Sequence, residues 1–128
     1  MIIVPLSNLD LEGLSADELV QRFADIGAAQ DEAELDGKIS WFNRLYQMHE
    51  AVENELRRRP GDGRRALIAL FQHRSGRARF NAAVALLAVE PVAARRMLER
   101  IRDWKIPPCA ADASGMLRSL DEGRYVPS

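Results

Sequence analysis

The sequence predicts an all-α fold in which short helices pack as successive antiparallel hairpins. Ala and Leu, which have the highest helix propensities, are abundant, whereas aromatic residues make up 6% of the chain. Apolar residues recur at three- and four-residue steps, and no segment alternates apolar and polar residues as a strand does. The connections are short, which makes neighbouring helices antiparallel. We therefore expect about six helices in one domain, residues 1–128.

The first expected helix begins after Ser15, and residues 1–14 are expected to be an irregular lead-in. Ser15 and Glu18 have the spacing of a capping box, in which each side chain accepts a hydrogen bond from the other residue's backbone amide. Gly37 is expected to end this helix or a short extension of it. The apolar face of the helix consists of Leu19, Phe23 and Ile26.

A second helix is expected over residues 40–59, so that residues 15–59 form a long N-terminal helix pair. Three consecutive arginines, 57–59, occupy its last turn, where positive charge offsets the helix dipole. Pro60 and Gly61 then stop the helix. Its apolar stripe consists of Phe42, Leu45, His49, Val52 and Leu56.

Shorter helices are expected to follow within residues 62–121. Pro91 suits the first turn of a helix, because an amide there has no helical partner. Pro107 and Pro108 separate the last two helices, and the tail 124–128 is expected to be irregular. The expected helices cover residues 63–72, 77–89, 91–104 and 110–120.

Residues 79–86, Arg-Phe-Asn-Ala-Ala-Val-Ala-Leu, resemble the second helix of a HEAT-type repeat. Residues 93–101 resemble the first helix of a following repeat, so the likeness covers about residues 62–104. The chain departs from the HEAT pattern where Arg74 and Ser75 occupy the place of the usual Asp. The resemblance implies an architecture and no ligand.

The whole chain also resembles DUF2019, a family of small bacterial proteins whose function is unknown. This resemblance implies an α–α superhelix of HEAT/ARM-like antiparallel helix hairpins. It implies no site residues, because the family has none that could be carried over. The segments that support it are residues 15–36, 42–45, 65–70 and 115–123.

Charge is distributed unevenly along the chain, although the net charge is only −1. Residues 1–56 contain 12 acidic and 3 basic residues, whereas residues 57–128 contain 7 acidic and 15 basic residues. The small net charge argues against a dedicated nucleic-acid-binding protein. The asymmetry matters for the choice of partner.

The single cysteine, Cys109, excludes an internal disulfide and a cysteine-based zinc cluster, and it favours a reducing, cytoplasmic environment. The apolar N-terminus is short and lacks a basic region, so we expect no signal peptide. No segment approaches the length that a transmembrane helix requires, and we expect no association with a membrane.

Two segments could suggest metal binding. Residues 32–43 begin like an EF-hand loop, but Glu32 replaces the first Asp and Asn43 replaces the bidentate Glu. His49 lies in a helix, but Glu53 occupies the position where a zincin has its second histidine. We interpret the acidic segment as a solvated face or a helix junction, and His49 as a core or semi-buried residue.

Nucleophilic catalysis would require Cys109 to meet His49 or His73, and no local signature accompanies the cysteine. Residues 61–65 lack the lysine and the spacing of a phosphate-binding loop. We therefore expect no catalytic residue, no metal and no cofactor, and we expect that the protein is not an enzyme.

The arginines after residue 57 are the most informative feature. If helix pairs stack, equivalent helix faces align and can bring arginines into one stripe. The planar guanidinium group suits carboxylate and phosphate recognition. The alternative is that these arginines are solvated or paired with the acidic first half. The candidate partner-binding residues are Arg64, Arg65, Arg77, Arg79, Arg95, Arg96 and Arg100.

These observations predict a binding module that acts on a protein partner with an acidic surface. The first alternative is binding of a nucleic-acid phosphate backbone by the same arginines. The second is an immunity-type inhibitor of a partner enzyme, by analogy with other small helical-repeat proteins. We expect a monomer or a weak homodimer, because no heptad pattern indicates a stable one.

Overall fold

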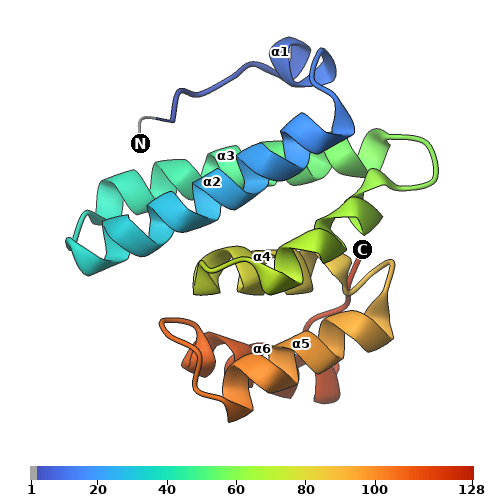
Figure 1. The fold of residues 1–128 in the computed structure, drawn as a ribbon. Helices are drawn as coiled ribbons and strands as arrows, with labels where there is room; N and C mark the ends of the chain where they lie inside the picture. The colour runs from blue at the N-terminus through green and yellow to red at the C-terminus, as the bar shows by residue number, and fades with distance from the viewer. Residues whose placement is uncertain (1–2) are drawn as a thin grey trace.

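The computed structural model describes residues 3–128, and within this range it contains six α-helices, one 3₁₀ helix and no strand. Figure 1 shows the helices as layers stacked in chain order, from the N-terminal segment to the last helix pair. The all-α fold expected from the sequence is confirmed. Within the described residues, no helix has both the length and the apolar composition needed to cross a membrane.

The first helix, α1 (Asn8–Glu12), corrects the expectation that residues 1–14 are irregular. Ser7 caps α1: its Oγ accepts from the Asp10 amide at 3.1 Å, and the Asp10 carboxylate accepts from the Ser7 amide at 3.2 Å. This is a capping box with Asp in the position usually held by Glu or Gln. Because α1 is only five residues long, it is too short to show the apolar periodicity of a longer helix.

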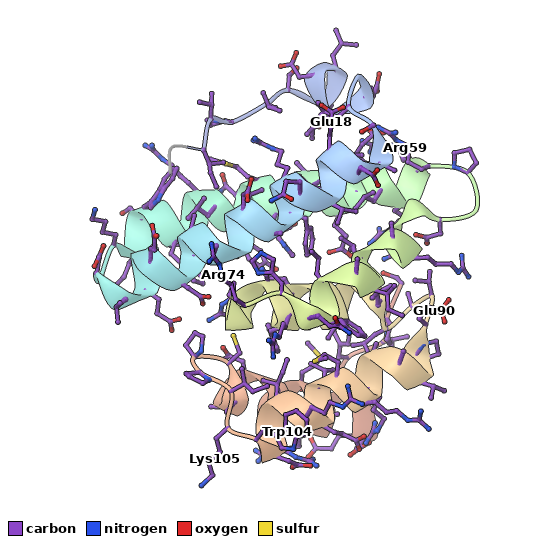
Figure 2. All side chains as sticks on the ribbon, viewed as in Figure 1. Glu18, Arg59, Arg74, Glu90, Trp104 and Lys105 are labelled. Carbon is purple, nitrogen blue, oxygen red and sulfur yellow. The ribbon has the colours of Figure 1, made fainter. Side chains whose placement is uncertain are left out.

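Arg59 attaches the end of α1 to the rest of the protein. Its guanidinium donates hydrogen bonds to the backbone carbonyls of Leu11 at 3.2 Å and Leu14 at 2.9 Å. Its Nε also donates a hydrogen bond to the Glu55 carboxylate at 2.7 Å. Figure 2 shows Arg59 between the α1 turn and the helices below it. The last of the three consecutive arginines therefore binds one carbonyl in the last turn of α1 and one just after the helix.

The first hairpin consists of α2 (Ala16–Leu35) and α3 (Ile39–Arg58). The capping box of Ser15 and Glu18 is confirmed, with hydrogen bonds of 2.9 and 3.1 Å. Gly37 lies in the turn with φ at +68°, a conformation that favours glycine, as expected for a helix end. The interior of the hairpin is formed by Leu19, Phe23, Ile26, Ala33, Leu45, Val52 and Leu56.

The second layer contacts the first through small residues on α4 (Gly76–Leu86). An ideal Cβ on Gly27 of α2 would lie 2.8 Å from Cα of Ala78. The two backbones are therefore in direct contact, and only glycine fits at this position of α2. The other buried small residues of α4 are Ala82, Ala83 and Ala85.

The other element of this layer is a 3₁₀ helix, η1 (Gly63–Gln72), where the sequence predicted a helix without specifying its type. Its buried residues are Arg64, Leu67 and Leu70, which are spaced three residues apart. A 3₁₀ helix has three residues per turn, so this spacing places all three side chains on one face.

The last layer consists of α5 (Pro91–Asp103) and α6 (Ala110–Asp121), which pack on each other, and α5 also packs on α4. Pro91 lies in the first turn of α5, as predicted. The tail 124–128 has no regular structure and returns to the middle layer (Figure 1). The core of this layer includes Ala94, Leu98, Ile101, Ala113 and Leu117.

Candidate functional site

The structure places the seven candidate arginines in three environments. Two are buried within ion-pair networks, and three are at the surface but engaged with neighbouring groups. Two are exposed without a carboxylate partner within residues 3–128. The buried pair is Arg64 and Arg77. The engaged surface residues are Arg65, Arg79 and Arg95, and the exposed residues without a carboxylate partner in this range are Arg96 and Arg100.

Arg64 is only 3% exposed and joins three parts of the chain. Its guanidinium lies 2.8 Å from the Asp62 carboxylate and 3.3 Å from that of Glu53, and it donates to the Ser128 carbonyl at 2.9 Å. The hydrogen bond from Arg64 lowers the pKa of Asp62, so this carboxyl stays ionised. Arg64 is therefore not available to a partner, contrary to the expectation that it contributes to a surface stripe.

Arg77 is also buried, at 7% exposure. It pairs with Glu34 of α2 at 3.1 Å and Asp112 of α6 at 3.3 Å. Its guanidinium carbon also lies 5.4 Å from the ring centroid of Phe42 and 5.7 Å from that of Phe80, within cation–π range. This arginine connects the first and last layers and is likewise absent from the exposed surface.

Arg65 and Arg95 are at the surface, but carboxylates of the same chain neutralise them. Arg65 lies 3.3 Å from Glu90, and Arg95 lies 2.8 Å from Asp121. Exposed pairs of this kind are screened by water and contribute little to stability. They nevertheless reduce the positive charge that a partner would meet.

Arg96 and Arg100 are exposed one turn apart on α5, and neither forms an ion pair within residues 3–128. The Arg100 guanidinium lies 6.0 Å from the ring centroid of Trp104, which is 70% exposed. Val92 continues this row one turn earlier and is 65% exposed. We call Val92, Arg96, Arg100 and Trp104 the α5 face. In Figure 2, Trp104 lies at the opposite end of α5 from Glu90.

A groove of about 240 Å³ lies beside the α5 face. Arg79 of α4 contributes to it, with its Nε bonded to the His73 carbonyl, which fixes the direction of the guanidinium. The groove therefore combines an apolar floor with two arginines and an exposed indole. Its lining residues are Phe71, Gln72, Arg79, Met97, Arg100, Trp104 and Ile106.

Trp104 was the residue that sequence reasoning missed. In the sequence it marks only the expected end of the helix over residues 91–104. Its position four residues after Arg100 was the available signal, because residues at this spacing are neighbours on a helix surface. Exposure of the indole could not be inferred from that spacing.

Cys109 and His49, the residues considered for catalysis, are buried, unlike the exposed residues of the α5 face. Cys109 is fully buried, and burial raises the pKa of its thiol to about 12, so the thiol is protonated. His49 is buried as expected, and burial together with Arg77 lowers its pKa to about 4. Within the part of the chain that the structure describes, no cluster of His, Cys, Asp or Glu could hold a metal ion.

Comparisons with known proteins agree with this architecture. The model of a family described as "Domain of unknown function (DUF2019)" matches residues 17–121. The chain is also similar to the crystal structure of the protein RPA1889 from Rhodopseudomonas palustris CGA009, with a TM-score of 0.90 and 41% sequence identity. That match covers 93% of this chain and 98% of RPA1889. A comparison with curated proteins finds no match.

Proposed function

The chain belongs to the DUF2019 family, and we propose that it is a non-catalytic binding module for a protein partner with an acidic surface. The α5 face is the binding surface. The observation that carries this proposal is that Arg96 and Arg100 form no ion pair within residues 3–128, and that Arg100 adjoins the 70% exposed Trp104. Tryptophan and arginine are the residues that most often dominate the binding energy of protein interfaces.

The charge distribution supports an acidic partner. Arg65 and Arg95 are compensated by Glu90 and Asp121, whereas the two arginines of the α5 face are left for an intermolecular contact. Complementary charge accelerates association and aligns the two surfaces. The apolar floor of the adjacent groove adds a place for an apolar side chain of the partner.

We infer that the helix pairs form a short HEAT/ARM-type superhelix. Three successive pairs support this description, namely α2 with α3, η1 with α4, and α5 with α6. In stacked repeats each pair contacts its neighbours and leaves an extended surface for partners. The buried thiol of Cys109 is compatible with the cytoplasm, which we propose as the compartment.

Binding to a nucleic-acid backbone is the less favoured function. Such proteins typically neutralise several phosphates, of the order of 6–10 in a strong complex. Here Arg64 and Arg77 are buried, and Arg65 and Arg95 are paired. The α5 face retains too few free cations for a comparable set of contacts.

The test is retention of a partner from a lysate of the source organism by the immobilised protein. We expect the wild type to retain a specific acidic protein and the double variant Arg96→Glu/Arg100→Glu to lose it. Affinity measured with the purified partner should fall by at least about 30-fold, as for substitution of interface hot spots. Trp104→Ala should weaken binding in the same way without changing the charge.

A matched control changes two exposed arginines outside the α5 face that also form no ion pair within residues 3–128, Arg44 and Arg118. The double variant Arg44→Glu/Arg118→Glu has the same net charge as the test variant, and circular dichroism should show that both stay folded. Equal loss of binding in both variants would contradict a specific role of the α5 face. A salt-sensitive gel shift without a retained protein would support nucleic acid instead.

A further inference from the structure

A second pocket, of about 370 Å³, is lined mainly by α3 and α4, and α6 and the C-terminal tail each contribute one lining residue. Its volume is in the range of small-molecule sites, roughly 300–1,000 Å³. It shares no lining residue with the groove beside the α5 face. We call it the α3–α4 pocket, and its lining residues are Tyr46, His49, Glu50, Glu53, Asn54, Arg57, Phe80, Asn81, Val84, Met116 and Tyr125.

One wall of the α3–α4 pocket is a polar edge of α3, with residues spaced by three and four positions. Its two carboxylates differ in their surroundings. Glu53 lies 3.5 Å from Arg57 and 3.3 Å from Arg64, so its charge is compensated. Glu50 is exposed and forms no ion pair within residues 3–128. The uncompensated charge at this wall is therefore negative.

The remaining walls are largely apolar and aromatic. Tyr46, Phe80 and Tyr125 come from α3, α4 and the tail, and Val84 and Met116 complete the surface. Aromatic ring faces attract cations, and the attraction is greater where water is partly excluded. Three rings with one free carboxylate thus favour a positively charged organic group over an anion.

His49 packs behind this wall without adding charge. Its ring packs against Phe23 at 4.8 Å and against Tyr46 at 5.6 Å between centroids. The lowered pKa of His49 keeps the imidazole neutral at pH 7, so it does not repel a cation. Burial, followed by the Glu50 and Glu53 carboxylates, raises the pKa of Tyr46, which agrees with a negative potential at that ring.

Arg57 limits the charge of the ligand. It lies seven residues after Glu50, which corresponds to about 10 Å along a helix. A cation can therefore occupy the end of the pocket near Tyr46 and Glu50, whereas a second positive charge would meet the guanidinium of Arg57 at the other end.

We propose that the α3–α4 pocket binds a monovalent organic cation, an ammonium or guanidinium group on a short aliphatic stem. Glu50 is the counter-ion, the rings of Tyr46 and Tyr125 flank the charged group, and Phe80, Val84 and Met116 contact the stem. The group can belong to a free amine or to a lysine or arginine side chain of another protein.

The experiment is a titration followed by amide chemical shifts, with n-butylguanidinium as the probe. We expect saturable shifts at residues of the α3–α4 pocket with a dissociation constant in the millimolar range, about 1 mM. Valerate, an anion of similar size, should cause no such shifts. Agmatine, which carries a second positive charge, should bind no more tightly than n-butylguanidinium, because of Arg57.

The variant Glu50→Gln should weaken binding of n-butylguanidinium about tenfold, because it removes the counter-ion and keeps the shape. Glu32→Gln is the control, since Glu32 is exposed, unpaired within residues 3–128 and outside the pocket. A blocked Gly-Arg-Gly peptide that binds more tightly than n-butylguanidinium would identify a protein side chain as the source. Weaker binding by the peptide would identify a free small molecule. Unchanged affinity in Glu50→Gln, or no saturable shift up to about 10 mM, would overturn the proposal.

Discussion

Replacing Gly27 with alanine sets two opposing effects against each other. Alanine is better than glycine in a helix interior by about 1 kcal/mol, which would stabilise α2. The new Cβ, however, would lie 2.8 Å from Cα and 2.9 Å from the backbone nitrogen of Ala78. Backbone atoms cannot rotate away, so α2 and α4 would have to separate. Overpacking of a core costs typically about 1–3 kcal/mol. Subtracting the propensity gain from this cost leaves an expected net loss of about 0–2 kcal/mol in the free energy of unfolding.

The control is Gly115→Ala in α6, where an added Cβ meets no atom within 4 Å. Only the propensity effect remains there, so this variant should be more stable than wild type by about 0.5–1 kcal/mol. Urea unfolding with unchanged m-values gives both free energies. If Gly27→Ala is stabilised as much as Gly115→Ala, the close contact of α2 with α4 does not exist and the packing argument is refuted.

Two further variants test the buried polar groups. The pKa of His49 is lowered from 6.5 to about 4, so the unfolded chain takes up the proton first as the pH falls. The free energy of unfolding should therefore drop by about 3 kcal/mol between pH 6.5 and about 4. His49→Leu should remove this part of the pH dependence, as measured by urea unfolding. An identical pH profile in the variant would contradict the lowered pKa of His49. Arg64→Ala should cost about 1–3 kcal/mol, because it leaves the half-buried Asp62 carboxylate without its partner and removes a buried side chain. The exposed Arg65→Ala should change stability by less than about 0.5 kcal/mol, and equal effects would show that Arg64 is not the buried residue described above.

Most helices could be predicted because their signals are local. The capping box of Ser15 and Glu18 and the first-turn position of Pro91 depend on hydrogen bonds and steric limits within a few residues. Two features have no clear local signal. α1 is only five residues long, and in η1 the three-residue spacing of Arg64, Leu67 and Leu70 differs little from that of an α-helix, so the sequence predicts a helix there without its 3₁₀ geometry.

The sequence by itself determined that the chain is helical, where most helices begin and end, and that its second part is rich in arginine. Only the tertiary structure decided what those arginines do. Arg77 is neutralised by Glu34, 43 residues away, whereas Arg96 is exposed and forms no ion pair within residues 3–128. A guanidinium can be buried only where the fold supplies compensating charge, because its desolvation is otherwise too costly. Charge compensation depends on distances across the whole fold, which local sequence patterns do not contain.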